Sequence, residues 1–214
     1  MKKTNVISGA VLLAVIAAHN VGAATKTNDF VDDLDLDKNM AVTTNYVWRG
    51  IAQSGGAAAV QGGANYEMKN GLGLDLWLSS SAAGGSDEVD ITVSYAMQKK
   101  RTGYEFGIIS YTYPQLAGAS FEEVFAGINA NDMNAYAYID TDSNRGSNIY
   151  LEFSIEIEEI KLTLGVNSND VATSDYNYIS AAVPLSREMT LSFSQTDINA
   201  DKQELALSYR FPIK

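Results

Sequence analysis

Hydrophobic and polar residues alternate one by one along most of the chain, and the segment 147–167 shows the pattern most plainly. Apolar side chains occupy every second position from Ile149 to Ile157 and again from Ile160 to Val166. Because successive side chains of a β-strand point to opposite faces, the two runs predict a β-hairpin with one apolar and one polar face. A soluble sandwich with its apolar face inward fits this pattern, and so does a membrane barrel with its apolar face outward.

The same alternation recurs from Met40 to Phe211 and predicts about twelve antiparallel strands separated by turn residues. Asn70-Gly71 is the clearest turn signal between two such runs. The expected strands are 40–49, 58–68, 72–79, 89–98, 104–109, 123–130, 133–140, 148–157, 160–167, 176–183, 190–194 and 204–211.

The connections between these strands alternate in length, and this decides which way the apolar face points. Connections after odd-numbered strands are longer and rich in Gly, Ser, Asn and Asp, whereas those after even-numbered strands are short. Outer-membrane barrels show this asymmetry, which a soluble barrel does not require. Aromatic residues are also expected near strand ends on the apolar face, at Trp48 and Phe121 beside the loops and at Tyr66, Tyr104, Tyr209 and Phe211 beside the turns. The sequence therefore predicts a transmembrane antiparallel up-and-down β-barrel, with a soluble sandwich or lipocalin-like barrel as the alternative.

The N-terminal region has the features of a secretory signal peptide. Lys2 and Lys3 precede an apolar run at 11–18, and small residues at 21–23 form a cleavage site. We expect a signal peptide at 1–23, an acidic periplasmic segment at 24–39 and the barrel at 40–214. The acidic segment is expected to be a mobile lead-in, with a cation-binding or plugging role as the alternative.

Composition excludes several classes of function. The formal charge is −11, which argues against nucleic acid as a partner, and there is no cysteine for a disulfide or a lipid anchor. His19 is the only histidine and lies in the expected signal peptide, so histidine-dependent hydrolysis and metal catalysis are not expected. A carboxylate pair is the remaining catalytic option. We therefore expect neither enzymatic activity nor a cofactor.

Three motifs resemble those of a known family. Residues 45–54 read NYVWRGIAQS and are followed by AVQGG at 59–63; YTYP at 111–114 and EVFAG at 123–127 come later. These segments are similar, in the same order, to motifs of the TorF-family porins of Gram-negative bacteria. The resemblance implies an outer-membrane barrel with a passive transport role. Ala52 stands where that family usually has serine, and the C-terminus does not end on an aromatic residue.

The polar face carries many more acids than bases, which indicates a cation preference for a water-filled lumen. The inward acids are Glu67, Asp75, Asp90, Glu105, Glu123, Asp140, Glu152, Glu156 and Glu204, against Arg49, Lys161 and Arg210. In the alternative, acids and bases pair across strands in a nearly closed interior that aromatic side chains fill. The aromatic residues expected to point inward are Trp77, Phe125, Tyr136, Tyr138 and Tyr150.

The first long loop supplies the best candidates for a constriction or a segment folded into the lumen, namely Arg49, Gly50, Gln53 and Ser54. An arginine at the mouth of an acidic pore would orient a dipolar solute; alternatively, it anchors the loop by bonding a carboxylate or carbonyls. The full set of pore-lining candidates is Arg49, Gln53, Asp75, Asp90, Glu123, Glu152 and Arg210.

These observations predict a porin-like channel of the cell outer membrane for passive diffusion of small hydrophilic solutes or ions. The alternative is a non-conducting structural or surface-interaction barrel with a plugged lumen. Expected partners are outer-membrane lipids and lipopolysaccharide, the diffusing solutes or ions, and the barrel-assembly machinery.

Overall fold

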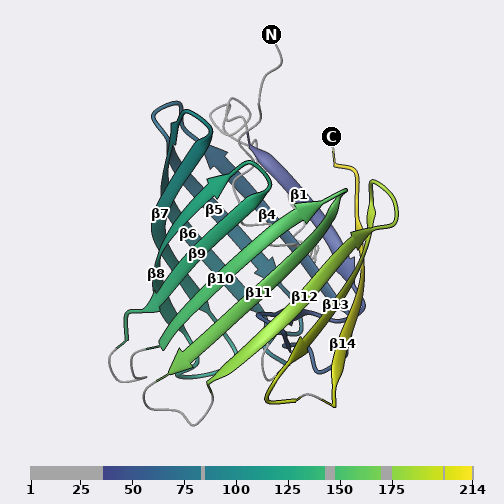
Figure 1. Ribbon diagram of the computed structural model, residues 1–214. Coiled ribbons are helices and arrows are strands. Elements are labelled where there is room, and N and C mark those ends of the chain that lie inside the picture. The colour runs from purple at the N-terminus through teal and green to yellow at the C-terminus, as the bar shows by residue number, and fades with distance from the viewer. Residues whose placement is uncertain (1–35, 83–84, 143–147, 170–174, 200, 214) are drawn as a thin grey trace.

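The computed structural model describes residues 36–82, 85–142, 148–169, 175–199 and 201–213, and its main feature is a closed β-barrel (Figure 1). Each barrel strand pairs antiparallel with its neighbours along the chain, and β1 closes the sheet by pairing with both β4 and β14. The twelve barrel strands are β1 (Asp37–Thr43), β4 (Ala59–Glu67), β5 (Leu72–Ser79), β6 (Glu88–Lys99), β7 (Thr102–Thr112), β8 (Phe121–Ala130), β9 (Met133–Asp140), β10 (Asn148–Ile157), β11 (Ile160–Asn169), β12 (Tyr176–Pro184), β13 (Met189–Thr196) and β14 (Gln203–Arg210). The predicted fold class and strand number are confirmed.

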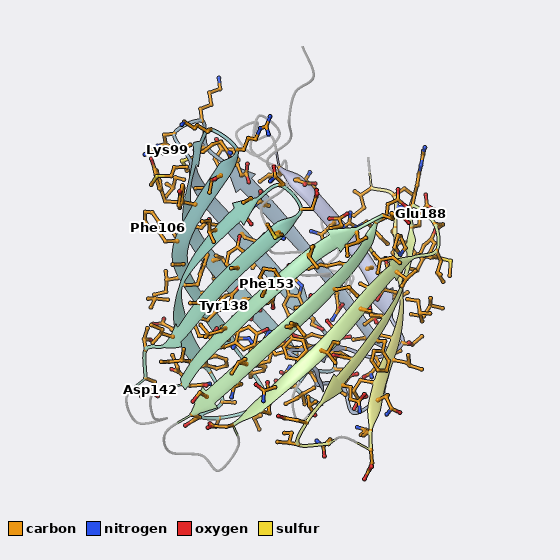
Figure 2. The ribbon with its side chains drawn as sticks, in the orientation of Figure 1. Lys99, Phe106, Tyr138, Asp142, Phe153 and Glu188 are labelled. Carbon is orange, nitrogen blue, oxygen red and sulfur yellow. The ribbon has the colours of Figure 1, made fainter. Side chains whose placement is uncertain are left out.

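The two ends of the barrel differ as the sequence predicted. Short turns such as 100–101, 131–132 and 158–159 lie at one end, together with the start of β1 and the C-terminus (Figure 1). The longer connections lie at the other end, so Lys99 and Glu188 stand opposite Asp142 (Figure 2). We call these the turn end and the loop end.

The apolar face of the sheet points outward. Leu164 is 55% exposed and Ile91 54%, whereas Tyr150 and Glu123, on the opposite face, are each 1% exposed. Phe106 and Phe153 also lie on the exposed outer face (Figure 2). A soluble barrel would bury the apolar face, so this arrangement matches a barrel whose outer surface contacts lipid. No helix in the described ranges is both long and apolar enough to span a membrane.

The first strand differs from its predicted bounds of 40–49. It begins at Asp37, because residues 37–39 already pair with β4, and it ends at Thr43. Beyond Thr43 the chain leaves the wall, so Tyr46 and Trp48 lie inside the barrel. The prediction that Trp48 and Phe121 belong to an outer aromatic belt is wrong, because the two rings pack on each other and on Tyr111 in the interior.

One pair of substitutions tests the outward orientation of the apolar face. Leu164 lies near the middle of β11 and Leu185 lies in the β12–β13 turn, and each is 55% exposed. Leu164→Arg should lower the free energy of unfolding in lipid vesicles by about 2–4 kcal/mol, because it places a charge near the bilayer midplane, whereas Leu185→Arg should change it by less than about 1 kcal/mol. Denaturant titration of both variants measures the difference. Equal effects would contradict a membrane-facing outer surface.

Candidate functional site

A short hairpin from the first long loop lies inside the barrel. It consists of β2 (Val47–Trp48) and β3 (Ile51–Ala52), with Arg49 and Gly50 at its tip. Both tip residues have positive φ, 48° and 82°, as a two-residue type I′ turn requires. Gly50 also fits closely against the wall, since a Cβ there would lie 2.6 Å from the Cβ of Tyr178 on β12. The hairpin tip therefore reaches the wall at β12, three strands from β1 around the barrel.

Hydrogen bonds at the base of the hairpin fix its entry into the lumen. The backbone N–H of Tyr46 donates to Ser54 Oγ (2.9 Å), and that hydroxyl donates to the Ala57 carbonyl (2.6 Å). Asn45 donates to Glu204 Oε2 on β14 at 3.1 Å. The side chain of Gln53 donates to the Ile51 carbonyl at 3.2 Å, so it stabilises the hairpin itself. These contacts hold the loop at its base, but they do not hold its tip.

A buried ion pair holds the tip. Arg49 donates from Nη1 to Glu123 Oε1 (2.7 Å) and from Nη2 to Oε2 (2.6 Å). The two residues are 8% and 1% exposed, and Tyr111 donates a further hydrogen bond to Glu123 Oε2 at 3.0 Å. Burial lowers the pKa of Arg49, but its hydrogen bonds to Glu123 outweigh that effect, so the pKa stays above the ordinary value for arginine. The guanidinium is therefore charged at every physiological pH.

Aromatic rings surround the same guanidinium. Its Cζ atom lies 3.8 Å from the ring centroid of Tyr150, 4.3 Å from that of Trp48 and 4.8 Å from that of Tyr138. Each contact of this kind contributes about 0.5–2 kcal/mol, more when water is excluded. The hydroxyl of Tyr150 donates to Glu152 Oε2 at 2.7 Å and lies 2.6 Å from the hydroxyl of Tyr178. A carboxylate and a set of aromatic faces thus enclose the positive charge.

A second cluster lies beside the hairpin around Tyr46. Its ring packs on Trp77 with centroids 5.4 Å apart, and burial raises the pKa of Tyr46 well above its usual value, with the carboxylates of Glu88 and Asp90 raising it further. Tyr113 donates to Glu88 Oε1 at 2.5 Å. Glu88 Oε2 and Asp90 Oδ1 are buried and make no hydrogen bond with a described atom. Among the described residues, no group of three or more acids or histidines is placed to hold a metal ion.

Burial of the inward side chains changes along the barrel axis. At the loop end Thr196 and Ser194 are 5% and 4% exposed, whereas Ser192 on the same face, nearer the turn end, is half-buried. On β6, Asp90 is 2% exposed while Thr92 is half-buried. The hairpin therefore fills the lumen at the loop end, while inward residues nearer the turn end range from half-buried, as Ser192 and Thr92 are, to buried, as Thr163 (6% exposed) and Glu105 (9%) are.

The structure brings some of the predicted pore-lining residues together and separates others. Arg49 and Glu123 form the ion pair, and Asp90 lies close by on β6. Asp75 and Glu152 are half-buried on the inward face of the wall. Arg210 is exposed at the turn end, where its backbone N–H donates to the Glu188 carbonyl, and it does not reach the constriction.

Sequence reasoning did not single out several residues of the site, namely Glu88, Tyr111, Tyr113 and Tyr178. Glu88 lies two positions before Asp90, and Tyr111 lies two positions after Ile109. Residues two positions apart on a strand face the same side, so Glu88 and Tyr111 point inward, as Asp90 and Ile109 were predicted to do. Strand parity was therefore the available signal, but the strand bounds drawn from the pattern were too short to include Glu88, Tyr111 and Tyr113.

A double-mutant cycle measures the coupling between Arg49 and Glu123. Glu123→Gln leaves a buried guanidinium without its counter-charge and should lower the free energy of unfolding by about 3–5 kcal/mol. Combining it with Arg49→Met should cost clearly less than the sum of the two single changes, with a coupling of about 1–3 kcal/mol. Denaturant unfolding in lipid vesicles gives both values.

The control for this cycle is the ion pair Lys202–Glu204, in which the lysine side chain is 65% exposed. Its coupling should be below about 1 kcal/mol, because water screens an exposed pair. Additive effects at Arg49 and Glu123 would show that the buried contact does not hold the hairpin.

Solved structures of outer-membrane proteins have the same fold. A KdgM porin matches with a TM-score of 0.55 and 9% identity, over 82% of this chain and 99% of that chain. The KdgM porin in complex with disordered oligogalacturonate matches with a TM-score of 0.51 and 8% identity, over 84% and 99% of the two chains. The outer membrane phospholipase A from Escherichia coli matches with a TM-score of 0.51 and 8% identity, over 86% of this chain and 93% of that chain. At these identities the likeness concerns the fold alone.

The sequence itself matches no curated protein. A family model does match it, across residues 32–211. That range includes all twelve barrel strands and the inward hairpin. The family's description names no function, so the resemblance to TorF-family porins remains a prediction. The chain belongs to the family described as "Bacterial protein of unknown function (Gcw_chp)".

Proposed function

We propose that this protein is a porin-like channel of the outer membrane, through which small hydrophilic solutes or ions diffuse passively, and that the hairpin in its first loop sets the constriction. The observation that carries the proposal is a hairpin that lies inside a closed barrel with a polar inward face and is held at its tip by side-chain contacts. The hairpin's two strands pair with each other and with no barrel strand. It therefore differs from a wall element and is able to move without opening the barrel.

The proposal includes the route by which the chain reaches its membrane. Residues 1–23 would be removed as a signal peptide, the acidic periplasmic segment expected at 24–39 would end before β1 begins at Asp37, and the barrel-assembly machinery would insert the strands. The exposed apolar belt, which includes Leu164 and Ile91, would then face outer-membrane lipids and lipopolysaccharide. The turn end, with both the start of β1 and the C-terminus, would face the periplasm.

A preference for cations is the finer part of the proposal. Glu88, Asp90 and Glu123 are buried within the lumen, and Asp75 and Glu152 line it more openly, whereas Arg49 is the buried base among the described residues. Carboxylates within a low-dielectric wall attract cations and repel anions. The oligogalacturonate found in complex with the KdgM porin is a chain of sugar acids. An acidic lumen disfavours such a solute, so we expect cationic or neutral solutes here.

The filled loop end favours a second candidate, a non-conducting barrel that presents its loops to partners. Tyr46, Trp77 and Tyr111 are all buried next to the hairpin, whose tip contacts β8 through Arg49 and β12 through Gly50. If the hairpin never moves, no ion passes. Conductance separates the two functions.

We do not propose an enzyme, although the fold is shared with a phospholipase. The sequence's single histidine, His19, lies outside the described residues and within the proposed signal peptide. A histidine base for acyl transfer would therefore be absent from the exported chain.

Planar-bilayer recording under a KCl gradient tests the channel and its selectivity. Protein first shown to be folded by heat-dependent gel mobility should give discrete conductance steps with a cation-selective reversal potential. Replacing Asp75→Asn and Glu152→Gln together should reduce the cation-to-anion permeability ratio by about two-fold or more, because the lumen loses two fixed charges.

The matched control replaces two exposed acids of the β10–β11 turn, Glu158→Gln and Glu159→Gln, and should leave the ratio unchanged. Folded protein that inserts into the bilayer and never conducts would contradict the channel proposal and support the plugged barrel.

A further inference from the structure

The pocket around Arg49 has the chemistry of a binding site for a guanidinium group. We infer that it recognises the guanidinium of a diffusing cationic solute, and that Arg49 is a tethered competitor for the same site. This inference rests on the proposed channel function and names the class of solute. It follows from three features of the pocket: where its walls come from, the shape they recognise, and the charge they leave if Arg49 withdraws.

Most of the pocket belongs to the barrel wall. Glu123 lies on β8, Tyr138 on β9 and Tyr150 on β10, while Trp48 belongs to the hairpin itself. These wall strands are joined by continuous backbone pairing. The pocket therefore keeps its shape when the hairpin moves, whereas a surface formed by the loop would be lost.

Hydrogen bonds among the wall residues also hold the pocket without Arg49. Tyr111 donates to Glu123 Oε2 at 3.0 Å, which orients the carboxylate from β7. Tyr150 donates to Glu152 and contacts the hydroxyl of Tyr178, which fixes its ring from β10 and β12. A preorganised pocket binds its ligand without first ordering these side chains.

The arrangement selects a flat, forked cation. Two parallel N–H···O bonds of 2.7 and 2.6 Å join the guanidinium to the two oxygens of Glu123, while the Tyr150 ring centroid lies 3.8 Å from its carbon. A guanidinium satisfies a bidentate carboxylate and stacks on an aromatic face, and an ammonium ion offers only a point charge to both. The pocket therefore discriminates between two cations of equal charge.

Withdrawal of Arg49 leaves a charge that another cation must neutralise. Glu123 is 1% exposed. Asp90, on β6, is also buried and faces the lumen. A buried carboxylate without a counter-charge is strongly disfavoured. The hairpin consequently leaves most readily when a solute guanidinium takes the place of Arg49, and this couples opening of the constriction to the arrival of the solute.

Equilibrium binding of methylguanidinium to the folded full-length protein tests this inference without requiring conduction. The chain has two tryptophans, Trp48 and Trp77, and both lie at the constriction, so their fluorescence reports binding. Arg49→Ala removes the tethered competitor and should bind methylguanidinium saturably. The wild-type protein should bind it about ten-fold or more weakly, because a tethered group competes at a millimolar or higher effective concentration.

Two comparisons decide the result. Adding Glu123→Gln to Arg49→Ala should weaken binding about ten-fold or more, since it removes the bidentate acceptor. Methylammonium should bind the Arg49→Ala variant clearly more weakly than methylguanidinium does. Equal affinity in the presence and absence of the Glu123 carboxylate, or equal affinity for the two cations, would overturn the inference.

A second variant covers the case in which Arg49→Ala does not fold. Arg49→Lys keeps a cation opposite Glu123 but lacks the planar fork, so methylguanidinium should displace it more readily than it displaces Arg49. If methylguanidinium binds both equally, the inference fails. Binding without any conductance would support the guanidinium site and refute the proposed channel. Conductance without binding would support the channel and refute the guanidinium site.

Discussion

The structure of the lumen depends on a single buried ion pair. The loop that follows β1 has to place a charged side chain, Arg49, in the centre of a barrel, and such a charge is stable there only with a hydrogen-bonded counter-charge. Glu123 supplies it from the opposite wall, in two hydrogen bonds. The aromatic faces of Tyr150, Trp48 and Tyr138 then exclude water from the pair. This contact is the charged link between the hairpin tip and the wall, beside the close packing of Gly50 against Tyr178.

The closed barrel makes this arrangement possible because its backbone pairing does not include the hairpin. Backbone pairing runs unbroken around the sheet, from β4 through β14 to β1. The hairpin is attached to the wall at its base through Asn45 and at its tip through Arg49, while Ser54 bonds within the loop. A continuous wall therefore surrounds an element that has its own internal pairing and is bound to the wall by side-chain contacts.

The sequence pattern predicts the barrel well because each barrel strand obeys the same two-residue period. Leu162, Leu164 and Val166 must face lipid if Thr163 and Asn167 face the interior, and one residue of known orientation fixes a whole strand. The inward orientation of Asp90 and Glu123 followed from this rule. The unequal lengths of the connections then predicted which end of the barrel carries the long loops and which carries the short turns.

The same rule fails in the first loop, where the alternation continues after the strand has ended. Residues 44–48 keep the period of β1, so Trp48 was predicted to point outward, whereas the chain actually bends inward after Thr43. Nothing local marks this bend. The contact that decides it joins Arg49 to a residue 74 positions away, and such a pairing depends on the geometry of the closed barrel.

Removing the hairpin tip is the most direct test of whether it closes the lumen. A chain in which residues 47–52 are replaced by a short Gly-Ser linker keeps all twelve barrel strands and the wall carboxylates. Its single-channel conductance in a planar bilayer should be several-fold higher than that of the wild-type protein, because the loop end of the lumen loses the element that fills it. An unchanged conductance from a folded, inserted barrel would contradict the account, since the constriction would then lie elsewhere.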